Sequence, residues 1–520
     1  MKRLLTLLTC FFALCAAACS GNGGTTVTPP PPTGPFSNSS LNGQYAFSMA
    51  GSAVTGASNG SFGRVGSFNA DGKGNIKSGV EDVNFPGQVS TAVLITGGTY
   101  SINADGRGTV NLTFSDATAD LKFAVTMTSI NDGLLIDVTS NTHEFTTASG
   151  NFFKQNPADF LASAINGNYV FDFAGTDPIT TFPASFIGKF FSNSAGQITG
   201  GLEDINAGGA LTPANPFTGS YSIDNANASS GRGTATIDGL TYAFYIVDQT
   251  RVRFIGLDGA GLLTGDAVQQ GAVPTTTAGI TGSFVFAIGG QSVTNGSLTR
   301  LGRFTSSSGS ATQVNVDTLA FLNTTVKQFA TSNVTGGVLT IDANGSGRGT
   351  LTFKDPNLTD TFQFVFYLAS ASSGVIQDDT NLTVADGSIN AQTDGPFSTS
   401  NIAGAYALNW SGVATQSGSF GEEDVIGQVA ISGLSVKGTS DINSFNALNV
   451  VPDAATAGTI VLGGDGTGGD ASRNKIRPLS LTQNGTINPN FVVYVVNPNT
   501  LFIATTDTDR IVLGTLVKQH

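Results

Sequence analysis

The ionisable side chains of this 520-residue chain support few kinds of chemistry, because it has only two histidines and three cysteines. His143 lies in a stretch without a counterpart elsewhere in the chain, and His520 is the last residue. Repeated Ser-His-Asp or Cys-His catalytic sets are therefore excluded, as is a His/Cys cluster for zinc, copper or haem. The sequence also lacks a Walker loop and a dinucleotide-binding fingerprint. Carboxylate chemistry or calcium binding remains.

The best carboxylate candidates lie in two matching stretches, VEDVN (Val80–Asn84) and LEDIN (Leu202–Asn206). Adjacent Glu and Asp on a strand point to opposite faces, so they are not a ready acid–base pair. Asp-x-Asn puts two oxygen-bearing side chains on one face, a spacing that suits calcium. In the structural alternative, which we favour, Asp and Asn cap backbone amides where a strand ends. The possible calcium ligands are Asp82, Asn84, Asp204 and Asn206.

An arginine recurs in the motif GRGT, as Arg107, Arg232 and Arg348. One role is functional: an exposed guanidinium that grips a carboxylate or phosphate ligand. The other is structural: the side chain folds over the end of its own sheet, packs on an aromatic ring such as Tyr45 or Tyr169, and donates to strand-end carbonyls. We favour the structural role, because glycine flanks each arginine and no second basic residue recurs nearby. The corresponding stretch near the C-terminus, GTIVLGGDGTGGD, keeps the turn glycines but lacks the arginine.

These motifs recur because the chain consists of four related units. The stretches LNGQYAFSMAG, INGNYVFDFAG, ITGSFVFAIGG and IAGAYALNWSG each open a unit, and Gly-x4-Gln closes each one. The period is too long for solenoid repeats, so each unit should have its own core. The predicted domains are residues 41–155, 165–270, 280–392 and 402–520, called units 1 to 4 below, and unit 4 is divergent.

Each unit reads as short strands separated by turn residues, with bulky apolar side chains on one face of the first strand. Such rows either fill a barrel or line a ligand cavity within it. We favour a filled core, because nearly all of these side chains are large. The rows are Tyr45, Phe47 and Met49; Tyr169, Phe171 and Phe173; Phe284, Phe286 and Ile288; and Tyr406, Leu408 and Trp410.

The predicted fold is all-β: four tandem eight-stranded antiparallel meander barrels, with β-sandwiches as the alternative. Hairpin-length links predict the meander, and closure into a barrel removes the exposed edges. The opening Gly-x-Tyr/Phe, the hairpin GTYSINADGRGT and the glycine that starts the last strand resemble the calycin group, meaning lipocalins and avidin-like barrels. The units also resemble bacterial repeat lipoproteins. The resemblance implies the architecture and no binding residue, because calycins have Trp where these units have Tyr or Phe.

The N-terminus, MKRLLTLLTCFFALCAAACSGNGG, is typical of an exported lipoprotein. Residues 1–18 form the predicted signal peptide, whose apolar stretch is too short to span a membrane. Cys19 is the predicted lipid-bearing residue and the sole cysteine of the mature chain; an ordinary cleavage site before it is the alternative. A Pro/Gly/Ser/Thr-rich tether completes residues 19–40. We expect a protein anchored by lipid in the cell envelope, in the outer membrane or at the cell surface.

The formal net charge of −13 argues against a nucleic-acid partner. We therefore expect a non-catalytic, lipid-anchored surface protein without a cofactor, whose barrels act as a stalk or as an adhesion or binding array. Its partners would be the membrane, through the lipid, and an extracellular protein or glycan. Two alternatives remain: a small apolar or carbohydrate ligand inside each barrel, or a carboxylate-dependent extracellular hydrolase.

Overall fold

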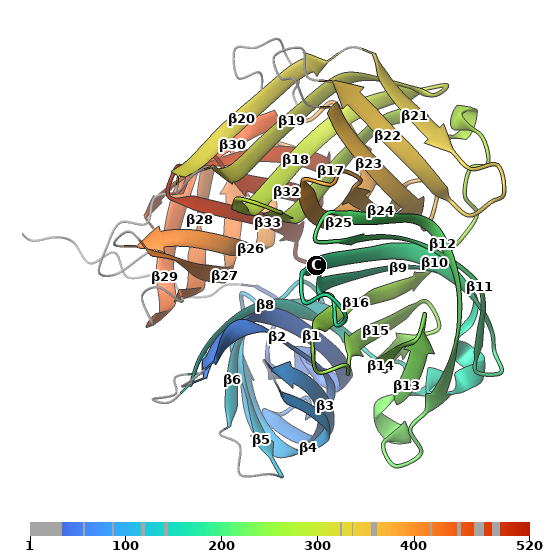
Figure 1. The fold of residues 1–520 in the computed structure, drawn as a ribbon. Coiled ribbons are helices and arrows are strands. Elements are labelled where there is room, and N and C mark those ends of the chain that lie inside the picture. The colour runs from blue at the N-terminus through green and yellow to red at the C-terminus, as the bar shows by residue number, and fades with distance from the viewer. Residues whose placement is uncertain are drawn as a thin grey trace, which may run out of the picture.

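The computed structural model describes residues 34–520 apart from 56–57, 86–87, 116–119, 140–143, 323–324, 335, 355–360, 417–418, 445–448, 462–472 and 481–488 (Figure 1). The signal peptide, Cys19, most of the tether and His143 lie outside the described residues. Apart from five short 3-10 helices, the assigned elements are all β-strands. No helix in the described part of the chain has the length and apolar character needed to cross a bilayer.

Units 1 and 2 are closed eight-stranded antiparallel barrels in which consecutive strands pair and the last strand pairs with the first. Unit 1 contains β1 (Asn42–Thr55), β2 (Ser58–Asp71), β3 (Asn75–Phe85), β4 (Gln88–Ile102), β5 (Arg107–Phe114), β6 (Leu121–Met127), β7 (Asp132–Asp137) and β8 (Glu144–Lys154). Unit 2 contains β9 (Asn166–Thr176), β10 (Pro183–Asn193), β11 (Gln197–Ala207), β12 (Ala210–Ile223), β13 (Arg232–Ile237), β14 (Leu240–Asp248), β15 (Arg251–Gly256) and β16 (Leu262–Gln269).

Unit 3 forms a nine-stranded sheet and unit 4 another closed eight-stranded barrel. Unit 3 contains β17 (Gly282–Ser292), β18 (Gly296–Ser307), β19 (Ser310–Leu322), β20 (Thr325–Val334), β21 (Gly337–Ile341), β22 (Arg348–Lys354), β23 (Thr361–Leu368), β24 (Ser373–Asp378) and β25 (Thr383–Ala391). Both β20 and β21 pair with β19, so together they take the place of β4 in unit 1. Unit 4 contains β26 (Gly404–Gln416), β27 (Ser419–Ser432), β28 (Ser435–Ser444), β29 (Asn449–Val461), β30 (Arg473–Ser480), β31 (Phe491–Asn497), β32 (Thr500–Thr505) and β33 (Arg510–Lys518). The predicted all-β architecture is confirmed, with closed eight-stranded meander barrels in units 1, 2 and 4. Unit 3 differs from the expected eight strands, because β20 and β21 occupy the place of one strand.

Each unit has its own packed interior. All twelve aromatic and aliphatic residues of the predicted first-strand rows are buried, and they belong to four separate core clusters, one in each unit. A small void beside Trp410 in unit 4 measures only about 20 Å³, room for about one water molecule. The rows therefore pack as cores, as expected, and leave no room there for a ligand.

The four units close into a ring rather than extending as a stalk (Figure 1). Four further apolar clusters lie between units: 1 with 2, 2 with 3, 3 with 4, and 4 with 1. These clusters consist of residues on the outer faces of the barrels, such as Val170 and Ile187 of unit 2 against Val365 and Tyr367 of unit 3. Each such contact between neighbouring units is called a junction below.

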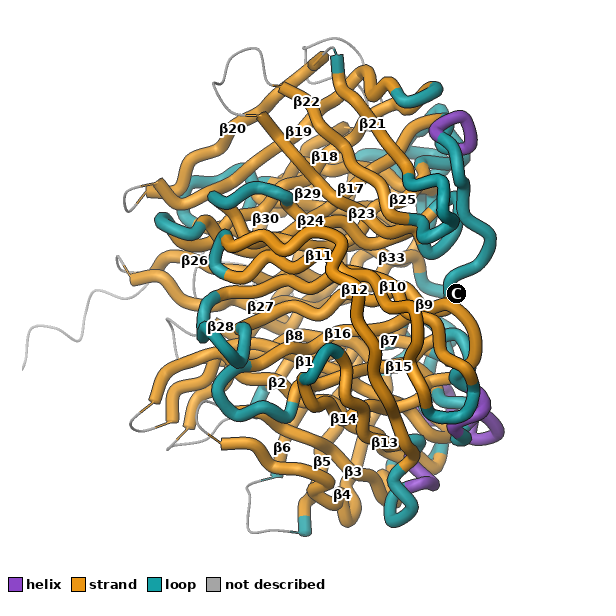
Figure 2. The backbone as a smooth tube through the Cα atoms, turned by 45° about the vertical axis from the view of Figure 1, so that its right-hand side comes forward, coloured by secondary structure: helices purple, strands orange, loops and turns teal. Residues whose placement is uncertain are grey.

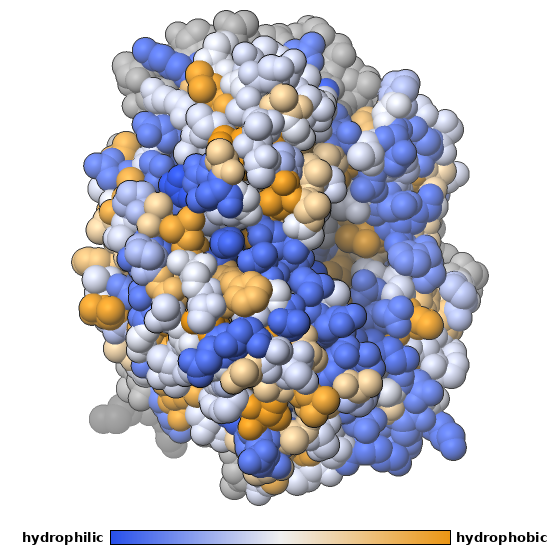
Figure 3. All heavy atoms as spheres, turned by 90° about the vertical axis from the view of Figure 1, so that its right-hand side faces the viewer, coloured by the Kyte–Doolittle hydropathy of each residue, from blue (hydrophilic) through white to orange (hydrophobic). Residues whose placement is uncertain are grey.

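The connections between units lie on one side of the ring. The 3-10 helices η1 (Asn38–Ser40), η2 (Pro157–Asp159), η3 (Ala162–Ala164), η4 (Ala228–Ser230) and η5 (Thr277–Gly279) gather there with the C-terminus (Figure 2). Phe36, where the tether meets unit 1, donates its backbone N–H to Ala104 O in the β4–β5 turn, which places the tether on this side too. Hydrophilic side chains cover most of the outer face in Figure 3, and apolar ones occur in small groups.

Candidate functional site

At the junction of units 1 and 2, a buried carboxylate of one barrel is held by the next. Asp82 on β3 is fully buried, and Arg232 at the start of β13 donates to both of its oxygens, from Nε at 2.8 Å and from Nη2 at 2.7 Å. Tyr245 lies opposite Arg232 in the β13–β14 register, and its hydroxyl donates to Asp82 Oδ2 at 2.7 Å. Burial, followed by the Asp82 charge, raises the pKa of Tyr245 well above its usual value, so the hydroxyl remains a donor. This bidentate, charge-assisted contact orients the two barrels.

The same contact recurs at the junction of units 2 and 3, and its tyrosine–aspartate hydrogen bond also recurs at the junction of units 3 and 4. Arg348 of unit 3 donates to both oxygens of Asp204 in unit 2, at 2.8 and 2.7 Å, and Tyr367 donates to Asp204 Oδ2 at 2.6 Å. At the junction of units 3 and 4, the Tyr494 hydroxyl donates to Asp317 Oδ2 at 2.8 Å. Each aspartate occupies the same register position, immediately opposite the residue that precedes the second-strand glycine.

The fourth junction closes the ring between units 4 and 1. Arg107 Nη2 donates to both oxygens of Asp441 in unit 4, at 2.9 and 2.8 Å, and to Asp453 Oδ1 at 2.8 Å. Thr126 lies opposite Arg107, where the other units have tyrosine. The first and last units are therefore joined by the same kind of ion pair as units 1 and 2 and units 2 and 3.

The expectation that unit 4 lacks the hairpin arginine is wrong. Arg473 opens β30 and pairs in the register with Tyr494, just as Arg232 pairs with Tyr245 and Arg348 with Tyr367. In the sequence, Arg473 lies beyond the GTIVLGGDGTGGD stretch and lacks the flanking glycines of GRGT, which concealed the equivalence.

The recurring arginines have a structural contact, but not the one expected. Arg107 and Arg232 are almost completely buried, with 5% of each residue exposed. Both arginines bind carboxylates of a neighbouring unit, and Arg232 also binds Asp224 of its own unit at 2.6 Å. Neither binds Tyr45 or Tyr169 of the first strands, whose hydroxyls donate to Ile130 O and Gln249 O. A guanidinium that grips a carboxylate is thus present, and the carboxylate belongs to the chain itself.

The asparagines of the Asp-x-Asn stretches also bind across junctions. Asn84 Nδ2 donates to Gly256 O and Gly261 O of unit 2, at 3.0 and 2.8 Å. Asn206 Nδ2 donates to three carbonyls of unit 3, at 2.7 to 3.2 Å. Within the described residues no group of three or more His, Cys, Asp or Glu is arranged to hold a metal ion. Calcium binding at Asp82, Asn84, Asp204 and Asn206 stays a prediction, and these contacts already occupy many of their polar atoms.

The neighbouring glutamates point the other way. Glu203 accepts a hydrogen bond from Asn215 Nδ2 at 3.0 Å, and burial raises the pKa of Glu203 to about 8. Asp204, in contrast, faces unit 3. Glu and Asp of LEDIN therefore lie on opposite faces of the strand, as the alternation requires.

The closing glutamines are functional contacts that the sequence reasoning used only as boundary marks. Gln155 Nε2 donates to Ser230 O and Ile246 O of unit 2, at 3.0 and 2.6 Å. Gln270 and Gln392 make equivalent bonds to units 3 and 4. Gln519 donates to Asp105 O and Met127 O of unit 1, at 2.9 and 2.8 Å. The sequence did contain a feature that marks these contacts: each unit has a Gln five residues after the last-strand glycine.

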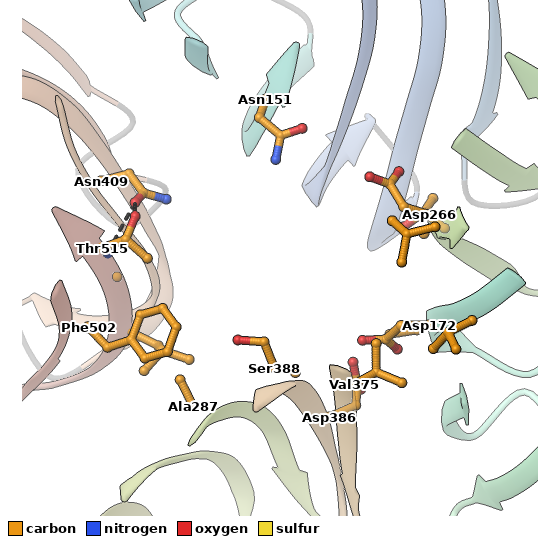
Figure 4. Close-up of a pocket in the computed structure, with 18 of the residues that line it drawn as sticks. Asn151, Asp172, Asp266, Ala287, Val375, Asp386, Ser388, Asn409, Phe502 and Thr515 are labelled. Carbon is orange, nitrogen blue, oxygen red and sulfur yellow. Dashed lines mark hydrogen bonds between the residues drawn. The ribbon is translucent and has the colours of Figure 1, made fainter. Parts of the chain in front are cut away.

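A cavity of about 640 Å³ lies where the four units meet, and every unit contributes to its wall (Figure 4). The wall comes from the pairing of first and last strand in each barrel, which we call the seam. Cross-strand partners at the seams supply most of the polar side chains: Asn151, Asp172 with Asp266, Ser388, and Asn409 with Thr515. We call this space the central cavity.

The seams are tight because glycine occupies the last strand next to these residues. A Cβ on Gly265 would lie 1.7 Å from Asp172 O, and one on Gly514 would lie 2.0 Å from Asn409 O. The equivalent distances for Gly150 and Gly387 are 1.9 and 2.1 Å, so no other residue fits. The glycine of Gly-x4-Gln thus permits barrel closure at the wall of the cavity.

Three carboxyl groups whose pKa values are shifted in different directions line the central cavity. Burial, followed by the charges of Asp386 and Asp266, raises the pKa of Asp172 well above its usual value. Burial also raises the pKa of Asp386 to about 6. Burial would raise the pKa of Asp266 too, but Arg253 and Arg251 outweigh it and lower the pKa below its usual value. Burial therefore favours the protonated form of the Asp172–Asp386 pair, whereas the two arginines favour the ionised form of Asp266.

A second buried carboxyl pair, Glu422 and Asp424, lies at the junction of units 4 and 1. Burial, and then Asp424, raises the pKa of Glu422 well above its usual value, and burial raises the pKa of Asp424 to about 7. Both oxygens of Asp424 lack a hydrogen bond partner of standard geometry among the described residues. Neither this pair nor the Asp172–Asp386 pair was identified from the sequence, because their members lie far apart in the chain or on outward faces.

Comparison with known proteins gives distant likenesses alone. No protein-family model matches the chain, and neither does any curated protein. A mutant of transferrin binding protein B from Haemophilus parasuis Hp5 is 12% identical, with 80% of this chain and 86% of that chain covered and a TM-score of 0.20. The protein of that name from serogroup B Neisseria meningitidis is 10% identical, with 76% and 86% covered and a TM-score of 0.20. At TM-scores this low, the likeness supports no conclusion about the function of this chain.

Proposed function

We propose that this chain is a non-catalytic, lipid-anchored binding protein of the cell envelope whose four barrels act as one ring-shaped body. The single observation that carries the proposal is the central cavity, to which all four units contribute polar side chains. Its volume of about 640 Å³ falls in the range of small-molecule sites. The packed barrel interiors favour this site over ligands held inside the individual barrels.

The envelope location rests on the sequence: a lipoprotein-like leader, Cys19 and a proline-rich tether. Because the tether meets the ring on the side of the unit connections, the opposite side would face away from the membrane. An extracellular small ligand, glycan or protein is the expected class of partner, and the net charge of −13 argues against nucleic acid.

The test is to fill the cavity without disturbing the junctions. Ser388 lies at the seam of unit 3 and lines the cavity, so Ser388→Trp places a large ring there. Fractions of small molecules from cell extract and growth medium are screened for a rise in the melting temperature of residues 34–520. A component that stabilises the native chain and not Ser388→Trp supports the proposal. If no component of any chemical class distinguishes the two proteins, the binding function is wrong.

A second candidate function, the carboxylate-dependent hydrolase, is favoured by Asp172 and Asp266. They are direct cross-strand partners, which places their Cβ atoms about 5 Å apart, and their pKa values are shifted in opposite directions. Retaining glycosidases use carboxyls at a similar separation. However, Asp266 is ion-paired with Arg251 at 2.6 Å and Arg253 at 3.0 Å, which makes it a weak base and a weak nucleophile. Hydrolysis of aryl glycosides that is lost in Asp172→Asn would establish this function in place of simple binding.

A further inference from the structure

The central cavity has a wall of hydrogen-bond donors whose acceptor atoms are already engaged. Asn409 Oδ1 accepts from the backbone N–H of Thr515 at 3.1 Å and from its hydroxyl at 2.5 Å, which fixes the orientation of the amide. Asn151 Oδ1 accepts from Arg253 in the same way. Both amide nitrogens then point towards the open space, where they have no hydrogen bond to the described part of the chain (Figure 4). An occupant with oxygen acceptors would satisfy them.

Carboxyl groups stand on the facing wall. Asp172 and Asp386 lie side by side there, from the first strand of unit 2 and the last strand of unit 3 (Figure 4). Carboxyl groups that share a proton both accept and donate hydrogen bonds. The Ser388 hydroxyl, between the donor wall and the carboxyl wall, can likewise do either. The cavity therefore presents donors and acceptors at separate points around one ring.

The formal charges around the cavity almost cancel. Asp266 is paired with Arg251 and Arg253, and 34% of the Arg251 side chain remains exposed. The Asp172–Asp386 pair adds one further negative charge when it holds a single proton, so two guanidinium groups face two negative charges. A cation or an anion would be transferred from water to a site without a net opposite charge, which costs free energy. A neutral molecule avoids this cost.

Apolar groups separate the polar ones. Phe502 and Ala287 lie between Asn409 and Ser388, and Val375 lies beside Asp172 and Asp386 (Figure 4). Leu513 also lines the cavity. A ligand that fits must therefore carry several hydroxyl groups together with C–H faces. Those are the properties of sugars and cyclic polyols.

We propose that the central cavity binds a neutral polyhydroxylated molecule of the saccharide class, whose hydroxyl oxygens accept from Asn151 and Asn409 and whose hydroxyl protons are donated to Asp172 and Asp386. The inference deepens the proposed binding function and rests on it. It predicts one ligand for each chain, since the four units build a single site. Free oligosaccharides and the terminus of a surface polysaccharide share this chemistry.

The test uses residues 34–520 and titration calorimetry with a panel of neutral mono- and disaccharides and myo-inositol. Spermidine and glycine betaine serve as cationic and zwitterionic probes, and a glycan array presents the same sugars as polymer ends. Asn409→Asp keeps an oxygen for Thr515 but replaces the amide donor with an acceptor. The matched control is Asn111→Asp on β5. The Asn111 amide does not line the cavity, and it donates to the Thr99 hydroxyl at 3.2 Å.

We expect one neutral saccharide to bind each chain, with affinity lowered about tenfold or more in Asn409→Asp and unchanged in Asn111→Asp. Binding to soluble sugars identifies the free form as ligand, and binding to the array alone identifies the polymer end. Equal loss in both variants, or binding of only spermidine or betaine, overturns the inference. If no probe binds although an extract component stabilises the native chain and not Ser388→Trp, the saccharide class is wrong while the binding function stands.

Discussion

Removal of the Arg232 guanidinium should destabilise the whole ring, since it leaves a carboxylate buried between two barrels. Asp82 is fully buried, and after Arg232→Ala it retains only the Tyr245 hydroxyl and the Ala92 N–H as donors. Breaking a buried ion pair on one side costs about 3–5 kcal/mol, whereas replacing both partners by apolar residues is often close to neutral. We therefore expect Arg232→Ala to lower the free energy of unfolding by about 3–5 kcal/mol and Asp82→Leu/Arg232→Met to lower it by only about 0–2 kcal/mol.

The assay is denaturant unfolding followed by two probes. Trp410, the sole tryptophan, is buried in unit 4, packs against Phe491 with ring centroids 5.2 Å apart and donates to Glu423 at 3.2 Å. Its fluorescence therefore reports on a unit that does not take part in the altered junction. Far-UV circular dichroism reports on all four units. If the ring unfolds cooperatively, Arg232→Ala shifts both transitions together. The exposed pair Lys77–Asp71, at 3.1 Å, provides the control, and Lys77→Ala should leave both curves in place.

Two results would refute the reasoning. An unchanged curve for Arg232→Ala would mean that the contact with Asp82 contributes nothing in solution. The second is an equal loss of unfolding free energy in Asp82→Leu/Arg232→Met and in Arg232→Ala. It would mean that the loss arises from packing around the Arg232 side chain rather than from the unpaired Asp82 charge.

Four further outcomes follow from the structure. Because burial raises the pKa of Asp424 to about 7 in the folded state, stability should fall as pH rises from about 4 to 7. Asp424→Asn should remove roughly 2–4 kcal/mol of this loss, measured as thermal unfolding from pH 4 to 8 against exposed Asp394→Asn. Over the same pH range, backbone hydrogen exchange should increase first in β27 and β8, at the junction of units 4 and 1, and in β10 and β25, at the junction of units 2 and 3. It should increase later in β2 and β16, at the junction of units 1 and 2, and an equal increase at all three junctions would contradict this. Residues 157–271 alone should form a β-rich barrel by circular dichroism but self-associate in gel filtration, since Tyr245, Ile187 and Val170 lose their cover, and a monomer with sharp thermal unfolding would show that the junctions are dispensable. Cys19→Ser should move the protein from the membrane to the soluble fraction, and wild-type protein that is soluble without detergent would disprove the lipid anchor.

The barrels could be predicted because each strand carries its own evidence. Alternation in the first strand identified the residues that fill the interiors, and turn glycines marked the hairpins. The ring had a weaker signal in the sixth strand, where both faces are apolar. In LTYAFYIV, Tyr242, Phe244 and Ile246 fill the barrel while Ala243 and Tyr245 face unit 1. The outer face of a barrel surrounded by water is normally polar, so the apolar outer face of this strand indicates that another part of the protein covers it.

The central cavity could not be predicted in the same way. Its wall combines residues that are far apart in the sequence, such as Asn151 and Asn409, and each looks like an ordinary polar residue on the outside of a strand. Their convergence depends on the angles at which the barrels meet, and those angles are determined by ion pairs between units. Asp82 and Arg232 were both singled out from the sequence, but nothing in a single chain links the VEDVN stretch of one unit to the GRGT turn of the next. Both motifs recur in the same order along the chain, which is compatible with a contact between one unit and the next but does not predict it.

The four junctions share a framework but differ at one position, and the difference divides the ring into halves. Gly63, Ser185, Thr299 and Asp424 each lie three residues before the second-strand glycine. At the junction of units 2 and 3, Ser185 lies beside Asp386 of the next unit, and its hydroxyl donates to Gln377 Oε1 at 2.7 Å; at the junction of units 4 and 1 the positions are exchanged, and Asp424 lies beside Ser149. Gly63 instead lies against the Thr264 methyl group, with no carboxyl group. Buried carboxyls with raised pKa values therefore occur at two opposite junctions, and each also has a second carboxyl, Asp172 or Glu422. We expect ionisation of these groups to weaken both junctions, which would divide the ring between units 1–2 and units 3–4. The Asp172–Asp386 pair lies both at such a junction and in the wall of the central cavity. A ligand that forms hydrogen bonds to this pair would therefore change its pKa values, and with them the stability of the junction between units 2 and 3.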